Sequence, residues 1–189
     1  MKRFTVTDFC QQFISNHIRA GSFCVDATAG NGHDTEFLCR LAGNPGKVLA
    51  FDIQELAVKN TLDRLTRLGL DHIGTVILDS HAHLANYVSP NCADCIMFNF
   101  GYLPGGDHQM ATKPETSLSA IRQGLECLKP GGLMSLCIYS GGDTGFEEKD
   151  ALLSFVKNLD PKKYLVIVSE YANRAGNPPV PVFIFKEVL

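Results

Sequence analysis

Hydrophobic and polar positions follow two different periods along this chain, and the change of period separates predicted strands from predicted helices. From about residue 22 onward, short runs rich in Val, Ile, Leu and Phe alternate with longer runs whose apolar residues recur every three or four positions. The short runs predict seven strands, at residues 23–27, 48–52, 75–78, 95–100, 133–139, 164–169 and 182–186. Strands that alternate with helices predict a mostly parallel sheet covered by helices on both faces.

The longer runs predict amphipathic helices. An opening helix is expected to stop at Gly21, and its apolar residues at helical spacing are Phe9, Phe13, Ile14 and Ile18. Further helices are expected from about residue 35 and over residues 54–68, 114–128 and 147–159. In the helix over 54–68, Val58, Leu62 and Leu65 are expected to form the apolar face.

The connection between the last two predicted strands is too short for a crossover helix. It contains the segment 172–179, with Gly176 and two prolines, and therefore predicts an antiparallel pair. Six parallel strands with one reversed last strand form the seven-stranded α/β layout of the class I, Rossmann-like methyltransferase fold. In such a sheet, ligands bind at the carboxyl ends of the strands, so side chains that follow each strand are the candidates for chemistry.

Composition narrows the class of protein further. The chain has 189 residues, a net charge of −3 and seven scattered cysteines, which predicts a single domain over 1–189 with reduced thiols and no overall basic surface. No apolar run reaches the length of a membrane span, so we expect a cytoplasmic protein without a membrane partner. The lone Cys92-x-x-Cys95 pair has no second pair at zinc spacing, so no metal site is expected.

The segment from Val25 to Thr35 joins an apolar strand to a helix through a loop with two glycines. Such a loop suits either a nicotinamide dinucleotide or S-adenosylmethionine, because glycine lets the backbone approach a ligand closely. A dinucleotide loop needs a third glycine so that a pyrophosphate can meet the helix N-terminus, and here His33 and Asp34 follow Gly32 instead. Carboxylates suit the cationic amino-acid end of S-adenosylmethionine, which is the cofactor that we favour.

The next two strands end in residues suited to the nucleoside part of this cofactor. Asp52 follows the second strand and can accept both ribose hydroxyls, while Ile53 can cover the adenine. The turn after the third strand would face the adenine edge. The candidate cofactor-binding residues are Asp26, Gly30, Asn31, Gly32, His33, Asp34, Thr35, Asp52, Ile53, Gln54, Asp79, Ser80, His81 and Asn99.

The fourth strand ends in Asn99-Phe-Gly-Tyr102, which resembles the Asn-Pro-Pro-Tyr element of amino-group methyltransferases. An Asn carbonyl can accept the N–H bonds of an amine and aim its lone pair at the methyl carbon. An aromatic ring can stack on a planar base. Asp107 or His108 could take a proton from an alkylammonium substrate, and Gly105 and Gly106 would shape the turn. Asn99, Tyr102 and Asp107 are the catalytic candidates.

Several motifs together resemble the small family formerly labelled rRNA methylases (the YtqB type), now associated with methylation of the wobble uridine of bacterial tRNA (the MnmM type). The matching segments are residues 26–35, 51–54, 99–107, 114–116 and 177–179, with His33 and Phe100 as departures from the family pattern. The resemblance implies N-methylation of the 5-aminomethyl group of that uridine with S-adenosylmethionine as donor. It implies that Asn99 orients the amine and that the tRNA anticodon arm is the partner. The substrate-binding candidates are Tyr102, Gly105, Gly106, His108, Lys113, Asn173, Arg174 and Asn177.

Other functions remain open on the residues alone. The same fold could serve an rRNA, small-molecule or protein N-methyltransferase, and a net charge of −3 suits a small acceptor. A nicotinamide-dependent oxidoreductase and a binding module without catalysis are further alternatives. A homodimer is also expected, because the apolar face of the opening helix could pair with a second copy.

Overall fold

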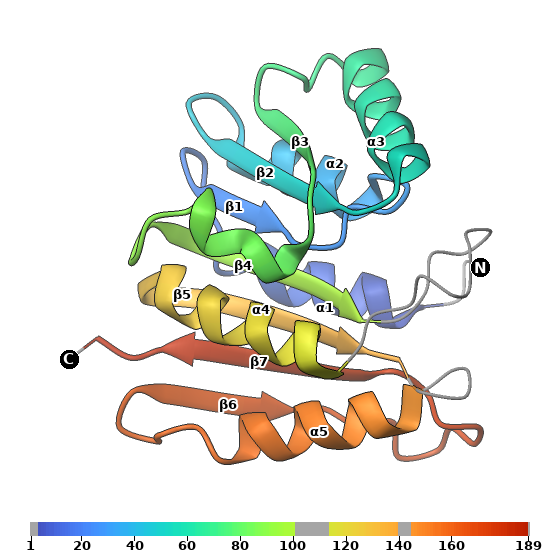
Figure 1. Ribbon diagram of the computed structural model, residues 1–189, viewed down its shortest axis with the longest axis vertical. Helices are drawn as coiled ribbons and strands as arrows, with labels where there is room; N and C mark the ends of the chain where they lie inside the picture. Colours follow the sequence, from blue (N-terminus) through green and yellow to red (C-terminus); the bar gives the residue numbers. More distant parts are fainter. Residues whose placement is uncertain (1–3, 101–113, 140–144, 189) are drawn as a thin grey trace.

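The computed structural model describes residues 4–100, 114–139 and 145–188, and within them a seven-stranded sheet forms the centre of the molecule (Figure 1). Its strands are β1 (Phe23–Asp26), β2 (Lys47–Asp52), β3 (Gly74–Leu78), β4 (Ala93–Phe100), β5 (Leu128–Ile138), β6 (Tyr164–Val168) and β7 (Val180–Lys186). The spatial order is β3-β2-β1-β4-β5-β7-β6. The pairs among β1 to β5 are parallel, whereas β7 is antiparallel to both neighbours. The predicted fold class is confirmed.

The sequence predicts the reversal of β7 but not its place in the sheet. β7 lies between β5 and β6, where it pairs with β5 from Leu133↔Phe185 to Ile138↔Val180. The strand next in sequence to β5 is therefore not its neighbour in space. One row of paired residues crosses three strands, because Asn99 of β4 is opposite Cys137 of β5, and Cys137 is opposite Pro181 of β7.

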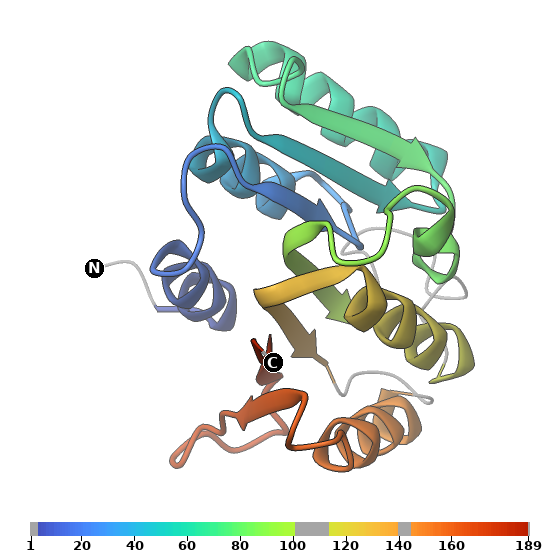
Figure 2. The ribbon, with the colours of Figure 1, turned by 90° about the vertical axis from the view of Figure 1, so that its left-hand side faces the viewer.

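Helices cover both faces of the sheet, and each face has its own apolar core (Figure 2). One face carries α1 (Val6–Ser15), α2 (His33–Ala42) and α3 (Glu55–Leu68). The other carries the 3₁₀ helix η1 (His81–Asn86), α4 (Pro114–Cys127) and α5 (Gly145–Lys157). No helix of the described part of the chain has the length and apolar character needed to cross a bilayer. The predicted three-layer arrangement is confirmed.

Helix α1 begins with a capping box. The Thr5 hydroxyl accepts from the Asp8 N–H at 3.1 Å, and the Asp8 carboxylate accepts from the Thr5 N–H at 2.9 Å. The helix ends at Ser15 rather than at the predicted Gly21, because tighter hydrogen bonds close the last turn at Asn16. Its apolar face is covered by the sheet, where Phe13 stacks on Phe183 at 3.9 Å. A homodimer, which stays a prediction, would therefore need another surface.

The predicted apolar face of α3 is confirmed at Leu65 and wrong at Leu62. The residues that α3 buries are Ala57, Thr61 and Leu65, whereas Leu62 is 42% exposed. The polar Thr61 can occupy the buried position because its hydroxyl donates to the Gly30 carbonyl at 3.1 Å. This face of α3 is therefore turned toward the loop that follows β1.

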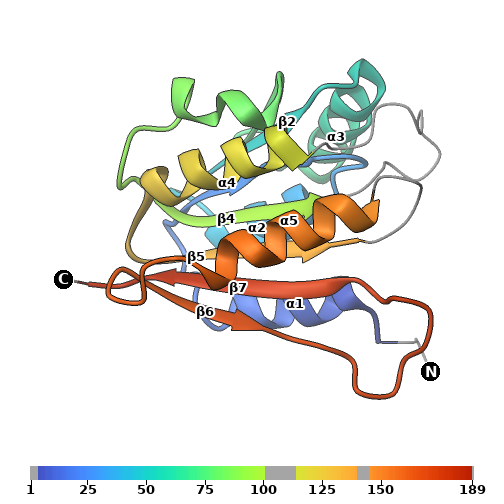
Figure 3. The same cartoon turned by 60° about the horizontal axis from the view of Figure 1, so that its bottom comes forward.

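The carboxyl ends of the parallel strands and the connection between β6 and β7 lie at the same end of the molecule (Figure 3). The first residues of α5 lie at this end as well. The fold therefore gathers the loop after β1, the end of β2, the end of β4 and the β6–β7 connection along one rim, as the sequence predicts.

Candidate active site

The loop between β1 and α2 is built on glycine. Gly30 has φ of +54° and Gly32 has φ of +76°, backbone conformations that disfavour residues with a Cβ. A Cβ on Gly32 would lie 3.0 Å from atoms of Thr61, so α3 also leaves little space there. The loop begins against Asp52, whose carboxylate accepts from the Gly30 N–H at 2.9 Å. Glycine at these two positions therefore lets the loop lie directly on α3.

Helix α3 holds this loop with three polar side chains. The Arg64 guanidinium donates to the Asn31 carbonyl at 2.8 Å, and the Asn60 amide donates to the Asn31 side chain at 3.0 Å. Thr61 binds the Gly30 carbonyl, as described above. Every peptide carbonyl that the loop presents toward α3 at Gly30 and Asn31 is thus bound. The position of the loop depends on α3 as much as on its own glycines.

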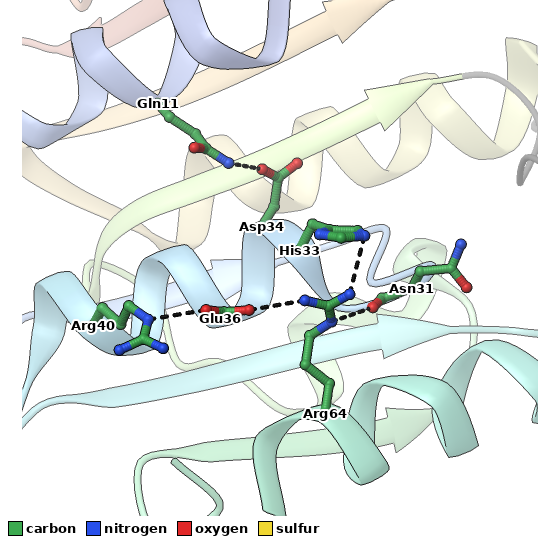
Figure 4. A network of polar contacts seen from close by, with 7 residues as sticks. All are labelled: Gln11, Asn31, His33, Asp34, Glu36, Arg40 and Arg64. Atoms are coloured by element: carbon green, nitrogen blue, oxygen red, sulfur yellow. Dashed lines mark hydrogen bonds and ion pairs between the residues drawn. The ribbon is translucent and has the colours of Figure 1, made fainter. Parts of the chain in front are cut away.

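Arg64 also connects the loop to the first turns of α2 (Figure 4). It donates to Glu36 at 2.9 Å and approaches His33 Nε2 at 3.0 Å, while Arg40 binds the second Glu36 oxygen at 2.9 Å. Because guanidinium only donates, His33 accepts through Nε2. The imidazole of His33, a predicted cofactor-binding residue, is therefore directed at Arg64.

Asp26, at the end of β1, is completely buried beneath the loop. Its carboxylate accepts from the Thr35 hydroxyl at 2.6 Å and from the Thr28 N–H at 3.1 Å. Burial, followed by the negative charge of Asp34, raises the pKa of Asp26 to about 7. A carboxyl group in this position binds a cation favourably, because the cation offsets the cost of ionising it.

Asp34 joins α1 to the end of β4. One of its oxygens accepts from the Gln11 amide and the other from the Asn99 amide, both at 2.7 Å, and the residue is only 8% exposed. The backbone N–H of Asn99 donates to the Thr28 hydroxyl at 2.8 Å. Because the Asn99 NH₂ faces Asp34, its carbonyl oxygen is directed to the other side. This carbonyl can accept the N–H of an amine.

The second strand end carries Asp52, Ile53 and Gln54. Asp52 accepts from the N–H groups of both Gly30 and Gln54 at 2.9 Å, so it braces the loop and the start of α3 together. The helix N-cap is Gln54 rather than Asp52. Ile53 is 51% exposed, as expected of a side chain that would cover a ligand. The carboxylate retains acceptor capacity for hydroxyl groups, since each oxygen has two lone pairs.

In the turn after β3, two predicted cofactor-binding residues, Asp79 and Ser80, make hydrogen bonds within the turn itself. Asp79 binds the Ser80 N–H, the His83 ring and the Tyr87 hydroxyl, and Ser80 caps η1 by accepting from Ala82. His81 differs, because its Nδ1 faces the Ala27 carbonyl at 3.2 Å, while its buried Nε2 has no hydrogen-bond partner among the described residues. Burial lowers the pKa of His81, so the ring is neutral and Nε2 is an acceptor.

The remaining predicted residues fall into two groups. Tyr102, Gly105, Gly106, Asp107, His108 and Lys113 lie outside the described residues and stay predictions. The other substrate-binding candidates, Asn173, Arg174 and Asn177, are exposed in the β6–β7 connection. Arg174 and Asn177 line a pocket of about 420 Å³ at that connection.

These features fit S-adenosylmethionine. The ammonium group of its amino-acid part would meet the buried carboxylates of Asp26 and Asp34, and its ribose hydroxyls would meet Asp52. Near the end of β1, His81 offers a buried acceptor that no described residue binds. A diphosphate would instead face the Asp34 carboxylate and would oppose the ionisation of Asp26. Among the described residues, no cluster of His, Cys, Asp or Glu could hold a metal ion.

The side chains that hold this site were not among the sequence candidates. They are Gln11, Thr28, Asn60, Thr61 and Arg64. The three on α3 stand at positions i, i+1 and i+4 of one helix face, a spacing that indicates a shared polar contact. The partner of that face is the loop after β1, which α2 and β2 separate from α3 in the chain, so local spacing cannot identify it.

The seven-stranded sheet with a reversed last strand, the glycine loop and the polar strand ends define a class I methyltransferase. Residues 48–185 match the family model described as "Putative rRNA methylase". The chain belongs to this rRNA methylase family. The family match confirms the predicted resemblance, and together with a solved relative in complex with SAH it confirms the predicted enzyme class, a methyltransferase that uses S-adenosylmethionine.

Solved structures and a curated relative agree with this family. A putative rRNA-methylase from Clostridium thermocellum is 41% identical, with a TM-score of 0.94 over 98% of this chain and 100% of that chain. SMU.1697c, a putative methyltransferase from Streptococcus mutans in complex with SAH, is 38% identical, with a TM-score of 0.87 over 98% and 99% of the two chains. The chloroplastic tRNA (mnm(5)s(2)U34)-methyltransferase of Arabidopsis thaliana is 35% identical over 178 residues, 89% of this chain and 65% of that protein.

Proposed function

We propose that this protein transfers a methyl group from S-adenosylmethionine to the nitrogen of a 5-aminomethyl group on the wobble uridine of tRNA. The observation that carries the proposal is the fixed orientation of Asn99, whose NH₂ donates to Asp34 at 2.7 Å. Its carbonyl is thereby presented at the end of β4 as an acceptor for an amine N–H. The 35% identity to a tRNA (mnm(5)s(2)U34)-methyltransferase supports the choice of tRNA.

The roles of the residues follow from this geometry. Asp26 and Asp34 would hold the cationic end of the cofactor, and Asp52 would bind its ribose. The backbone of the Gly30–Gly32 loop would lie against the cofactor. The cofactor supplies a methyl group that its sulfonium has already activated. Asn99 would then fix the direction of the amine lone pair, so that alignment supplies most of the acceleration.

Two further roles rest on residues outside the described part of the chain. Tyr102 would stack on the uracil ring, and Asp107 or His108 would accept a proton from the substrate ammonium before transfer. An alkylammonium must lose this proton because only the neutral amine has a free lone pair. The anticodon arm of tRNA is the proposed partner, with Lys113, Asn173, Arg174 and Asn177 as its contacts.

The test is nucleoside mass spectrometry of tRNA that carries 5-aminomethyluridine, after incubation with the protein and S-adenosylmethionine. We expect one added methyl group on that nucleoside. Asn99→Ala should lower turnover more than tenfold while donor affinity changes less than twofold, because the residue aligns the amine. Asn158→Ala, an exposed asparagine at the far end of α5, is the matched control. An equal loss of donor affinity in Asn99→Ala would show that the assigned role is wrong.

An rRNA acceptor is the second candidate, because the family description names rRNA. The same assay with ribosomal RNA as acceptor separates the two. Methylation of rRNA with no methylation of 5-aminomethyluridine would overturn the tRNA proposal. A small neutral acceptor would be recognised by activity that hardly changes with salt, whereas activity on RNA falls steeply as salt rises.

A further inference from the structure

We propose that the pocket between α5 and the β6–β7 connection binds the nucleotide next to the target uridine. Lys149 and Arg174 would bind its phosphate, and Tyr171 would stack on its base. The inference rests on the proposed RNA substrate and adds Lys149 and Tyr171 as substrate-binding residues. It assigns to this pocket the recognition of an RNA backbone rather than of the reacting base.

The pocket has a volume of about 420 Å³ and contains two cationic side chains from different elements. Lys149 comes from the second turn of α5, and Arg174 comes from the β6–β7 connection. Among the described residues, neither of them forms an ion pair within 4.0 Å of a carboxylate. Glu170 is the acidic residue in the described lining, so the pocket has a net positive charge. A positive pocket on a chain of net charge −3 is a local feature suited to an anion.

Tyr171 adds an aromatic side chain to the same pocket lining. The side chain is half-buried, and burial raises the pKa of its phenol, so the ring is neutral at physiological pH. A neutral ring does not repel a phosphate and can stack on any base. The combination of a stacking surface with cations for the backbone is typical of sites for single-stranded nucleic acid. An acidic peptide would use the cations but would gain little from the ring.

The strand that leads from the pocket, β7, lies two strands away from Asn99, a separation that suits a neighbouring nucleotide. The paired row Asn99, Cys137 and Pro181 crosses from β4 through β5 to β7, and the lining residues Pro179 and Val180 immediately precede Pro181. Two strand spacings correspond to about 10 Å. A base held at Asn99 would therefore leave the adjoining phosphate and base within reach of Lys149, Tyr171 and Arg174.

The experiment measures binding of a fluorescently labelled, unmodified anticodon stem-loop RNA at several salt concentrations. Lys149→Ala and Arg174→Ala should each weaken binding about five- to tenfold. Each should also lower the slope of log K against log salt by about 0.7 to 0.9, the value for one phosphate contact. Lys157→Ala is the matched control, because Lys157 lies on the same helix and is exposed about 12 Å further along it. It should bind RNA as the wild type does.

The aromatic contact is tested separately from the charges. Tyr171→Phe retains the ring and should bind RNA within about twofold of the wild type. Tyr171→Ala should weaken binding about ten- to a hundredfold, the loss expected for one stacked base, with an unchanged salt slope. Unchanged binding of S-adenosylhomocysteine in every variant shows that the folded cofactor site is intact.

The outcomes separate the pocket from the proposed reaction. If the wild type methylates 5-aminomethyluridine but Lys149→Ala and Arg174→Ala bind RNA like Lys157→Ala, the pocket assignment is overturned and the reaction stands. If the wild type does not methylate that nucleoside but RNA binding depends on both cations and the ring, the pocket stands and the reaction is overturned. Competition by poly-glutamate as strong as that by RNA would overturn the assignment to RNA, as would no RNA binding by the wild type.

Discussion

Asp26 and Asp34 lie close together beneath the glycine loop, yet their contacts give them different roles. Asp26 is completely buried and binds groups of its own segment, Thr28 and Thr35. Asp34 binds side chains of α1 and β4 and so fixes the direction of the Asn99 amide. In the proposed arrangement, Asp26 is therefore the group whose ionisation would respond to a bound cation, whereas Asp34 would determine which end of Asn99 faces the substrate.

Cofactor affinity should depend on pH through Asp26. Burial, Asp34 and Asp52 raise its pKa to about 7 in the folded protein without cofactor, although Thr35 and Thr28 act in the opposite direction. A bound cation favours the ionised form, so affinity for S-adenosylmethionine should rise up to tenfold per pH unit below pH 7 and level off above it. Isothermal titration calorimetry between pH 5.5 and 8.5 measures this. In Asp26→Asn the rise of affinity with pH should disappear. If affinity rose equally with pH in the variant and the wild type, Asp26 would not be the group responsible.

The Asp26 carboxyl affects the stability of the fold in the opposite direction: higher pH favours cofactor binding but lowers the free energy of unfolding. The pKa of Asp26 is about 7 in the folded protein against the ordinary value of 3.8, so the folded state holds a proton that the unfolded state releases between about pH 4 and 7. The contribution of Asp26 to the free energy of unfolding therefore falls as pH rises through this window. Cofactor binding reverses part of this loss because the cation pairs with the carboxylate.

At the scale of elements, α3 is the support on which the cofactor loop lies. Asn60, Thr61 and Arg64 bind the loop at Gly30 and Asn31, and Arg64 extends the contact to α2. The loop itself has two glycines with positive φ, so it would have many alternative conformations without this support. The conformation that meets the cofactor is thus determined by a helix that touches no cofactor atom in the proposed arrangement.

Removal of the Arg64 guanidinium should weaken cofactor binding without changing the chemical step. Arg64→Met leaves the Asn31 carbonyl without its donor, and we expect donor affinity to fall about tenfold while kcat stays within twofold. Calorimetry and steady-state kinetics measure the two quantities. Arg40→Met is the control, because Arg40 is 55% exposed and binds only Glu36 in this network, so its loss should cost less than twofold. A kcat loss as large as the affinity loss would contradict a positioning role.

Sequence patterns predicted the elements well and their contacts less well. The strands have a strong local signal, since each is a short apolar run bounded by polar residues, and the reversal of β7 follows from a short connection. The insertion of β7 beside β5 has no such signal, because it depends on pairing between distant segments. For α3, apolarity favoured Leu62 over Thr61, but a hydrogen bond to Gly30 made the threonine the buried residue.

The same distinction applies to the site. Asp26, Asp52 and Asn99 could be proposed because each lies at the carboxyl end of a strand, and the carboxyl ends of parallel strands share one edge. Gln11, Thr28 and Arg64 could not, because their partners lie on other elements. The roles of Asp79 and Ser80 were also hidden, since their contacts with Tyr87 and Ala82 depend on how η1 folds back.

At the scale of the whole molecule, the fold presents one rim with acidic groups under the loop and cationic groups at the β6–β7 connection. The acidic side suits a cationic cofactor, and the cationic side suits an anionic substrate. In this proposal, β4 and β5 separate the cofactor-binding side of the rim from the substrate-binding side. Asn99, the proposed hydrogen-bond acceptor for the substrate amine, lies between the two sides.

Cofactor choice can be measured on the folded protein as a whole. At a hundred times its dissociation constant, a ligand stabilises the folded state by about 2.7 kcal/mol, which corresponds to about 5–10 °C in the melting temperature of a chain of this size. S-Adenosylmethionine should produce such a shift, and NADH should produce none, because Asp26 and Asp34 oppose a diphosphate. A larger shift with NADH would favour the nicotinamide alternative.

The contact between Gln11 and Asp34 ties the N-terminal helix to the site, and that helix packs on Phe183 near the other end of the chain. Helix α1 therefore packs on a strand that is remote from it in the sequence, and the same helix holds Asp34 through Gln11. The glycine loop has its own support on α3, so it does not need this contact to keep its position. The alignment of the Asn99 amide is instead coupled to the docking of α1 on β7, two elements that the site itself does not contain.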